Sequence, residues 1–413
     1  MVGPVAQLVK RHIRIVEIAG SNPARSTMTN QIKPNTASGH SQKTGQISWE
    51  DLIFLPAQLA KRPVDYFKEK INSSTIIGKR SKKPIKIGIP LVNAAMSFGA
   101  LSKNAKIALA QASRLANTIA NTGEGGMLPE ERKSAKFLIA QYSTGRFGVD
   151  EKYLQSADAI EIKIGQGAKP GQGGLLPAEK VTAQIAKIRK VKMSQNLHSP
   201  AAHPDIFSIN DLKKKINWLR KLTGNKPIIL KLGAGDVEED IKLAVQANPD
   251  IIAIDGLEGG TGAAPKVMLD QVGLPTMAAL VRARKVLDKL KAPQELWIGG
   301  GIRNGADAAK ALALGADIVF LGFSLIEAMG CIKCRQCYLG KCPLGIATQE
   351  PKLVAKLDVK KTAQKIAGFL LAETENIKMI AGATGKNDVY KLNKNDLRAM
   401  SPFISQISGV KII

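Results

Sequence analysis

The strongest constraint on the fold of this chain is a repeated alternation between short apolar segments and amphipathic helical segments. Eight apolar segments are typical of strands: Ile85–Asn93, Thr118–Asn121, Phe137–Gln141, Ala159–Ile164, Ile228–Leu232, Ile251–Asp255, Leu296–Gly299 and Ile318–Leu321. Helical patterns lie between several of them, at Lys103–Leu115, Ala178–Lys190, Val237–Ala247, Thr276–Leu290 and Ala306–Leu314. Strands that alternate with helices indicate a parallel sheet with helical crossovers. The pattern therefore predicts an α/β fold, a closed (β/α)8 TIM barrel, with an open doubly wound sheet as the alternative.

Two connections, 165–178 and 191–226, are long for such a barrel. Because long loops carry function more often than they carry structure, we expect both to contribute to a site. Extra helices are expected at both ends of the barrel: before the first strand, from about Trp49 to Pro84, and in residues 351–413, packed on the outside.

The first 47 residues do not share this pattern. Residues 1–27 have no amphipathic period and resemble the conceptual translation of a transfer-RNA gene, so we expect the natural start at Met28. The polar stretch Thr29–Gln46 is typical of disorder. The predicted organisation is a disordered or wrongly assigned extension (1–47), a barrel domain (48–350) and a C-terminal helical extension (351–413).

The net charge of the chain limits its partners. The chain has 60 Lys and Arg residues and 34 Asp and Glu residues, which gives a net charge of +26. This balance favours an acidic partner, or simply a Lys-rich surface that aids solubility. With 4% aromatic residues the chain has few rings to stack on bases, so we expect no nucleic acid. There is no apolar run of about 18 residues and no clean signal peptide, so no membrane partner and a cytoplasmic location are expected.

All four cysteines lie in one short segment. Cys331, Cys334, Cys337 and Cys342 follow the pattern C-x2-C-x2-C-x4-C-P, close to the cysteine run of bacterial ferredoxins. In a cytosolic protein this density indicates metal or redox chemistry and not structural disulfides. The spacing favours a single iron–sulfur cluster over zinc, whose sites usually separate two CxxC pairs by a longer loop.

Glycines close the last two predicted strands. Gly299, Gly300 and Gly301 follow the seventh strand, and Leu321-Gly322-Phe323-Ser324 closes the eighth. Glycine lets the backbone approach a phosphate, and the loops after strands 7 and 8 are the usual phosphate site of such a barrel. These glycines favour a phosphate-bearing cofactor over simple tight turns.

Charged residues occur in three other glycine-rich loops at strand ends: 121–126 with Glu124, 161–171 with Lys163 and Lys169, and 255–262. Since the carboxyl ends of all strands meet at one mouth of a barrel, we expect these loops to converge there. His203, in Ser199-Pro-Ala-Ala-His203, is either a general acid or a loop cap.

The sequence resembles the FMN-binding synthase domain of glutamate synthase, especially its stand-alone archaeal-type form. The resemblance runs from about Trp49 to the tail. It is carried by FLPAQLAKRP (54–63), MSFGALS (96–102), NTGEGG (121–126), STGRFGVD (143–150), EIKIGQGAKPGQGG (161–174), EGGTGAAP (258–265) and CPLGIATQ (342–349). It implies a (β/α)8 barrel with FMN at its C-terminal mouth and an iron–sulfur cysteine loop, 331–342, after the eighth strand.

The resemblance also implies roles for individual residues. Cys331, Cys337 and Cys342 match the three ligands of a 3Fe-4S cluster, and the additional Cys334 leaves a 4Fe-4S cluster open. Glu124 and Lys169 match residues that hold 2-oxoglutarate. The expected FMN contacts are Ala95, Met96, Ser97, Asn121, Lys163, Gly260, Gly299, Gly300, Gly301 and Gly322.

Three departures from the family pattern concern the substrate. Leu175 stands where the large enzymes have a substrate-binding Gln, and Pro204 replaces the second His of SPPPHHD. Neither Met1-Val2 nor Met28-Thr29 supplies the N-terminal Cys that hydrolyses glutamine in the large enzymes. Ammonia is therefore expected to be free or to come from a separate glutaminase chain.

The predicted activity is reduction of the imine of 2-oxoglutarate and ammonia to L-glutamate by FMN, with electrons relayed by the cluster. Lys163 would stabilise the anionic reduced flavin, Lys169 would pair the substrate carboxylate, and Glu124 would position the imine or ammonium. Since no strand–GxGxxG–helix fingerprint occurs, the expected donor is a ferredoxin or a reductase subunit. The alternatives are an N-methylglutamate synthase-like subunit that uses methylamine, and a non-catalytic electron-transfer or nucleic-acid-binding module.

Overall fold

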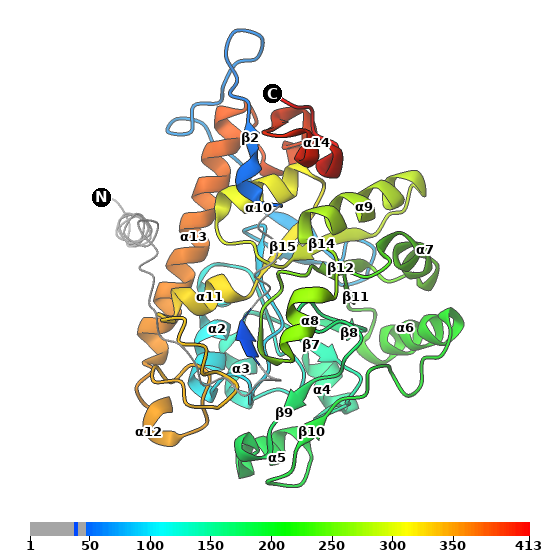
Figure 1. Ribbon diagram of the computed structural model, residues 1–413, viewed down its shortest axis with the longest axis vertical. Coiled ribbons are helices and arrows are strands. Elements are labelled where there is room, and N and C mark those ends of the chain that lie inside the picture. Colours follow the sequence, from blue (N-terminus) through cyan, green and yellow to red (C-terminus); the bar gives the residue numbers. More distant parts are fainter. Residues whose placement is uncertain (1–36, 40–46) are drawn as a thin grey trace.

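The computed structural model describes residues 37–39 and 47–413. Its centre is one eight-stranded sheet in which every paired neighbour is parallel (Figure 1). In chain order its strands are β5 (Leu91–Asn93), β6 (Ile119–Asn121), β7 (Phe137–Tyr142), β8 (Ala159–Lys163), β11 (Ile228–Gly233), β12 (Ile251–Asp255), β14 (Glu295–Gly299) and β15 (Ile318–Leu321). From β6 to β15 each strand of this sheet pairs with the next one along the chain, and β15 returns to pair with β5. A doubly wound sheet would reverse its strand order, so the predicted barrel is confirmed.

One seam of the barrel is closed by side chains. Within the described residues no backbone ladder joins β5 to β6. The Thr118 hydroxyl donates to the carbonyl oxygen of Leu91 at 2.7 Å and bridges the lower part of this seam. The barrel is therefore nearly closed.

The barrel interior is packed with apolar side chains below the mouth. Val92, Ile229, Ile251, Trp297 and Ile318 belong to one buried cluster inside the sheet. The predicted first strand, 85–93, is in fact two strands: β4 (Ile85–Ile87) pairs antiparallel with β3 (Thr75–Ile77), and only β5 joins the barrel. The β3–β4 hairpin adds Ile77, Ile85 and Ile87 to the same cluster, so the floor is filled and the carboxyl end is left for a site.

Helices surround the sheet, most of them where the sequence pattern placed them. α2 (Lys103–Leu115), α7 (Val237–Ala247), α9 (Thr276–Lys289) and α10 (Gly305–Ala313) match their predicted spans within a residue or two. The predicted helix 178–190 divides instead into a 3-10 turn, η3 (Ala178–Lys180), and α5 (Ala183–Arg189). Thr182 accepts from the backbone N–H of Ile185 as the N-cap of α5, and this cap starts a new helix.

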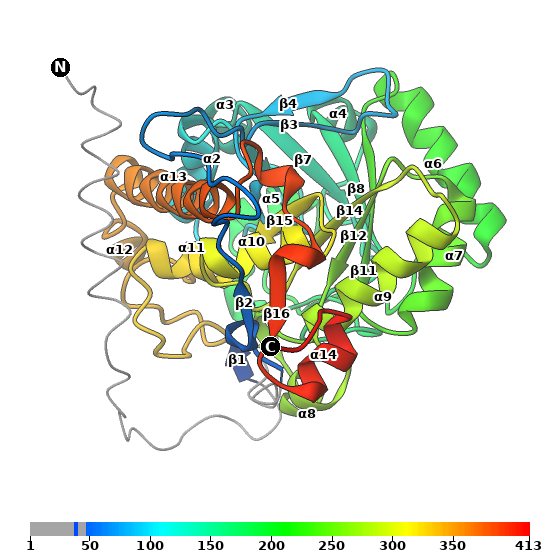
Figure 2. The same cartoon turned by 90° about the horizontal axis from the view of Figure 1, so that it is seen from above.

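The prediction of a loop over 191–226 is wrong for 209–223. These residues form α6 (Ile209–Thr223), capped by Ser208 and ended by Gly224 at a φ of 69°. Leu212, Ile216 and Leu219 are buried at helical spacing. The remaining helices of the barrel layer are the short α3 (Pro129–Ser134) and α4 (Glu151–Ser156). α6 and α7 lie side by side on the outside of the sheet in both views (Figures 1 and 2).

Both ends of the described chain pack against the barrel. α13 (Val359–Ala383), after α12 (Pro351–Val354), packs on α2 and α10 and completes the ring of helices (Figure 2). β16 (Leu397–Ala399) pairs antiparallel with β2 (Leu52–Phe54), and α14 (Pro402–Ser408) follows. Residues 49–90, all of which the structure describes, hold only the 3-10 turn η2 (Trp49–Asp51) and strands β2 to β4, so the helices expected there are not formed.

Part of the N-terminal stretch expected to be disordered is a strand. β1 (Ala37–Gly39) pairs antiparallel with β13 (Thr261–Ala264), and the remainder of 1–46, with the expected start at Met28, lies outside the described residues. The domain boundaries at 47 and 350 therefore stay predictions. In the described part of the chain no helix is both long enough and apolar enough to span a bilayer.

Candidate functional site

A cavity of about 880 Å³ opens at the carboxyl ends of the barrel strands. Most of the residues expected at a site line this one cavity: Ala95, Met96, Ser97, Glu124, Lys163, Lys169, Gly260, Gly300, Gly301, Gly322, Cys331, Cys337 and Cys342. Asn121, Gly299 and Cys334 do not line it. Loops far apart in the sequence therefore converge, as the barrel topology predicted.

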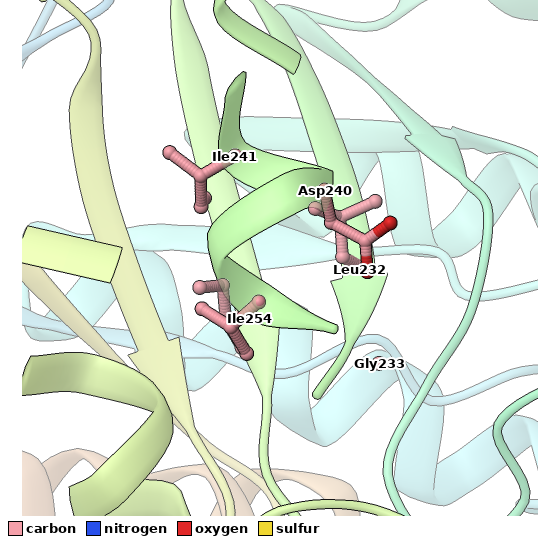
Figure 3. Close-up of a pocket in the computed structure, with 6 residues that line it drawn as sticks. Leu232, Gly233, Asp240, Ile241 and Ile254 are labelled. Atoms are coloured by element: carbon pink, nitrogen blue, oxygen red, sulfur yellow. The ribbon is translucent and has the colours of Figure 1, made fainter. Parts of the chain in front are cut away.

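A second hollow lies between β11, β12 and α7 and is lined by Leu232, Gly233, Val237, Asp240, Ile241 and Ile254 (Figure 3). Its apolar side chains fill it, and it has no free space for a ligand. It is part of the packing between helix and sheet, so we do not consider it as a site.

Glu124 and Lys163 form a buried ion pair in the large cavity. Lys163 lies at the end of β8, Glu124 lies in the loop after β6, and Lys163 Nζ is 3.0 Å from Glu124 Oε2. The hydroxyl of Ser199 donates to the other carboxylate oxygen. Burial alone would raise the pKa of Glu124, but the charge of Lys163, these hydrogen bonds and the charge of Arg189 lower it to about 2. Glu124 is thus an anion at any working pH.

Two further cations lie near this pair. Lys169 is buried, donates to the carbonyl of Ala263 at 3.1 Å, and has a pKa lowered to about 8 by burial and by the charge of Lys163. Arg189, at the end of α5, lines the cavity and donates through one terminal nitrogen to the carbonyl of Phe98 at 2.7 Å. Its buried Nε has no partner among the described residues. A buried guanidinium donor without an acceptor suits a carboxylate ligand.

A polar layer lies below these cations. Lys231, register partner of Lys163 on the neighbouring strand, pairs with Asp255 at 3.4 Å. Glu161 accepts from Gln141 Nε2 at 2.6 Å and from Asn121 Nδ2 at 3.2 Å. Asn121 is therefore buried beneath the mouth and does not line it. The layer offers the cavity both a cation, Lys231, and an amide, Gln141.

Different constraints act on the glycines after β14 and β15. A Cβ on Gly299 would lie 2.0 Å from the Phe320 ring, so the ring accounts for that glycine. Gly300 and Gly301 have φ values of 113° and 65°, where an L side chain is strained. A Cβ on Gly322 would meet only Ala94 at 3.6 Å, an ordinary contact. The packing of the protein would therefore allow a side chain at position 322. A ligand that approaches the backbone closely would explain why this residue is glycine.

Ser324 supports the same interpretation. It lies in α11 (Phe323–Ala328), lines the cavity, and has a buried hydroxyl without a partner among the described residues. A phosphate at Gly300, Gly301 and Gly322 would accept from this hydroxyl. The residues present therefore fit the phosphate end of FMN.

His203 supports the end of β8 and does not line the cavity. Arg146 can only donate, so His203 Nδ1, 2.7 Å away, accepts, and Nε2–H donates to the Lys163 carbonyl at 2.8 Å. Burial and the charge of Arg146 lower the pKa of His203 to about 4, which keeps it neutral. A positioning role thus fits His203 better than general acid catalysis.

Three of the four cysteines face the cavity. Cys342 is buried and Cys331 and Cys337 are half-buried, whereas Cys334 is exposed. Burial, with the negative charge of the neighbouring cysteine thiolates, raises the pKa of Cys337 to about 11. Lys180 extends from η3 and donates to the Cys337 carbonyl. Within the described residues no three His, Cys, Asp or Glu side chains are arranged to hold a single metal ion, so the donor set fits a cluster by its chemistry only.

A short antiparallel pair of strands covers one side of the cavity. β9 (Leu175–Leu176) pairs with β10 (Leu197–His198), and the side of the cavity they form is lined by Gly174, Leu175, Leu176, Pro177, Leu197 and Ser199. Leu175 thus presents an apolar side chain to the same cavity as Glu124.

The fold and the mouth together define a (β/α)8 barrel with a large cavity at the carboxyl ends of its strands, lined by buried cations and glycines. Among solved structures, a mandelate oxidase variant with an FMN adduct aligns with a TM-score of 0.55 at 17% identity, over 88% of this chain and 94% of that chain. A flavocytochrome b2 variant with sulfite aligns with a TM-score of 0.57 at 16% identity, over 91% and 83%. These likenesses show the fold.

The sequence comparisons show the family. A model of the conserved region in glutamate synthase matches residues 26–387. The chain is 41% identical to "Archaeal-type glutamate synthase [NADPH]" of Thermotoga sp. (strain RQ2), over 84% of this chain and 73% of the relative. It is 38% identical to "Archaeal glutamate synthase [NADPH]" of Methanocaldococcus jannaschii, over 86% and 75%. The chain belongs to the glutamate synthase family of oxidoreductases.

Proposed function

We propose that this chain is an FMN-dependent synthase that reduces the imine of 2-oxoglutarate and ammonia to L-glutamate. The observation that carries the proposal is the arrangement around Glu124: a buried anion bound by Lys163, with Lys169 and Arg189 close by in one cavity. A substrate with two carboxylates and a nascent ammonium needs two cations and one anion. The names of the relatives, archaeal-type glutamate synthases, agree with this substrate.

The chain's own residues would hold FMN at both ends. Gly300, Gly301, Gly322 and Ser324 would bind the phosphate, and residues 95–97 with Gln141 would border the ring. Lys163 and Lys231, which approach from adjacent strands, would stabilise negative charge on the ring.

Bound FMN supplies the hydride that converts the imine carbon to an amine carbon. Arg189 and Lys169 would pair the two carboxylates of 2-oxoglutarate and fix its orientation in the cavity. Glu124, ionised because of Lys163 and Ser199, would hold the cationic nitrogen of the imine. The antiparallel pair β9–β10 would limit access of water from its side.

The electrons would reach the site through the cysteine loop. Cys331, Cys337 and Cys342 would ligate a cluster that supplies single electrons, and Cys334, which does not line the cavity, would stay outside the ligand set. This favours 3Fe-4S over 4Fe-4S. The donor would be a ferredoxin or a reductase subunit; the relatives' names give NADPH for those proteins. Ammonia would be free or come from a separate glutaminase chain.

A related reaction with methylamine is favoured by one observation. Leu175 lines the cavity where the large enzymes have a polar Gln, so the wall there is apolar. An apolar wall would accept the methyl group of an N-methyl imine, and the product would then be N-methylglutamate.

The experiment is anaerobic stopped-flow reoxidation of the reduced, FMN-loaded protein. We expect 2-oxoglutarate with ammonium to reoxidise the flavin, 2-oxoglutarate alone to do so slowly, and L-glutamate to accumulate in proportion to the flavin. Faster reoxidation with methylamine would favour the second reaction. A flavin that no amine and keto acid reoxidise would point to a non-catalytic electron-transfer module and contradict the proposal.

A further inference from the structure

A buried lysine outside the cavity ties two of its loops together. Lys106 lies on α2 with its side chain 1% exposed, and its ammonium donates to the carbonyl of Met96 and, at 3.0 Å each, to those of Asn121 and Thr122. Met96 follows β5, Asn121 is the last residue of β6, and Thr122 comes directly after it. One ammonium thus satisfies carbonyls at the carboxyl ends of two barrel strands.

The charge of Lys106 has a buried partner. Glu131, on α3, lies 2.9 Å from Lys106 Nζ, and its side chain is also 1% exposed. Neither residue lines the cavity, so the pair is not available to a substrate. Burying two charges is costly unless hydrogen bonds complete the pair. Three carbonyls complete the lysine's side, whereas Glu131 Oε2 has no partner among the described residues, and burial raises the pKa of Glu131.

The location of the pair suggests what it does. β5 and β6 are the strands that no ladder joins within the described residues, so the upper part of this seam lacks the backbone bonds that fix the other strand ends. Lys106 bridges the seam at that level, as Thr118 does lower down. The loops are also in close backbone contact there, since a Cβ on Gly123 would lie 2.5 Å from the Ser97 nitrogen.

We propose that Lys106 and Glu131 are positioning residues that hold loops 95–97 and 121–124 in register at the cavity mouth. The first loop borders the expected FMN ring, and the second ends in Glu124, so the pair sets both the cofactor cradle and the substrate anion. The consequence for FMN rests on the proposed function; the ordering of the two loops does not.

The test compares Lys106→Met with Lys226→Met. Lys226 also donates to two main-chain carbonyls, Gln155 at 2.6 Å and Ala157, but it lies before β11 at the opposite rim of the barrel. We expect both variants to lower the melting temperature. Lys106→Met alone should raise the Kd for FMN, measured by quenching of flavin fluorescence, by tenfold or more, while Lys226→Met stays within twofold of wild type.

Hydrogen exchange on the FMN-free protein gives a reading that does not depend on the cofactor. We expect Lys106→Met to speed exchange in residues 95–101 and 121–126 and not in β11 or β12. Glu131→Gln preserves the side-chain volume at position 131 and leaves Lys106 in place. We expect it to speed exchange in the same residues to a smaller extent. This variant keeps the test available if Lys106→Met does not fold. If neither variant changes exchange in these loops beyond the level of the Lys226→Met control, the inference is wrong.

The two proposals fail separately. A wild type that binds FMN but makes no glutamate would contradict the proposed function and leave the loop measurements valid. An unchanged FMN Kd in Lys106→Met, with wild-type turnover, would contradict the positioning role and leave the synthase proposal intact.

Discussion

Lys163 Nζ lies 3.0 Å from Glu124 Oε2, so the end of β8 and the loop after β6 are joined by a buried ion pair inside the cavity. The Lys163 carbonyl in turn accepts from neutral His203, which holds the lysine backbone in place. This pair determines the charge state of the substrate site.

The ion pair predicts an acid dependence of stability. The pKa of Glu124 is about 2 in the folded protein against an ordinary value of 4.5, so its ionised form stabilises the fold above pH 4.5. This contribution, roughly 3 kcal/mol, is lost as the pH falls from 4.5 towards 2. We expect the difference in free energy of unfolding between wild type and Glu124→Gln to shrink over that window, measured by urea unfolding. A difference that is constant from pH 6 to pH 3 would mean that Glu124 is not held as an anion.

The lowered pKa of Lys169 predicts that substrate binding weakens at high pH, whereas the stability contribution of Glu124 is lost at low pH. Its pKa of about 8 makes it a cation below pH 8 and neutral above, because burial and Lys163 disfavour the charge. The Kd for 2-oxoglutarate should therefore rise with pH above 8, by roughly tenfold per pH unit at first. Lys169→Ala should raise it by roughly tenfold to a thousandfold at pH 7, with flavin content unchanged.

Lys169→Arg is the control for this prediction. A guanidinium stays charged over the whole range but has a wider, planar shape. We expect weaker binding with no break near pH 8. Equal Kd values for wild type and Lys169→Ala would place the substrate elsewhere in the cavity.

Leu175 should determine the choice of amine. Leu175→Gln places an amide in a lining that is now apolar. We expect it to tighten 2-oxoglutarate binding and to lower kcat/KM for methylamine relative to ammonium by about tenfold, the range that one methyl group in a pocket provides. Leu176→Gln, the next residue of the same strand, is the comparison. An unchanged ratio in Leu175→Gln would exclude this side chain from the amine site.

Three of the four cysteines should be required for iron binding, and the fourth should not. Cys331→Ser, Cys337→Ser and Cys342→Ser should each lose iron, whereas the exposed Cys334→Ser should keep it and show the same oxidised EPR signal as wild type. Iron and acid-labile sulfide per chain are the measurements. Full iron in every single variant would rule out a cluster in this loop.

The fold was largely readable from the sequence because its elements have local signals. α2 begins after Ser102, whose side chain caps Ala105, and its small apolar residues recur at helical spacing, so its bounds were predicted correctly. α6 was missed although Leu212, Ile216 and Leu219 have the same spacing. The many lysines on its exposed face, and its position after a long loop, made this apolar spacing hard to recognise in the sequence.

The first strand shows what the sequence could not resolve. Residues 85–93 are mostly apolar, with Lys86 and Asn93 as the polar exceptions, but β4 pairs with β3 below the barrel and only β5 joins the sheet. An apolar run does not say which partner it pairs with, since pairing is decided by contacts far along the chain.

Most of the expected site residues that line the cavity lie in glycine-rich loops, whereas two charged residues of the lining that lie in regular structure were not predicted. Lys231 lies inside an apolar strand, and Arg189 ends a short helix, so neither stood out. A charged residue within an otherwise buried strand was the signal for Lys231. Asn121 and Gly299 were assigned to the cofactor, yet one is buried in a side-chain network and the other makes room for Phe320.

The most direct test of the central claim is incorporation of nitrogen. The FMN-loaded protein is supplied with reduced methyl viologen as electron donor, 2-oxoglutarate and 15N-ammonium, and the products are analysed by mass spectrometry. We predict L-glutamate labelled at its amino group, formed catalytically and abolished in Glu124→Gln. Reduced flavin that persists with no labelled amino acid, from ammonium or from labelled methylamine, would contradict the account.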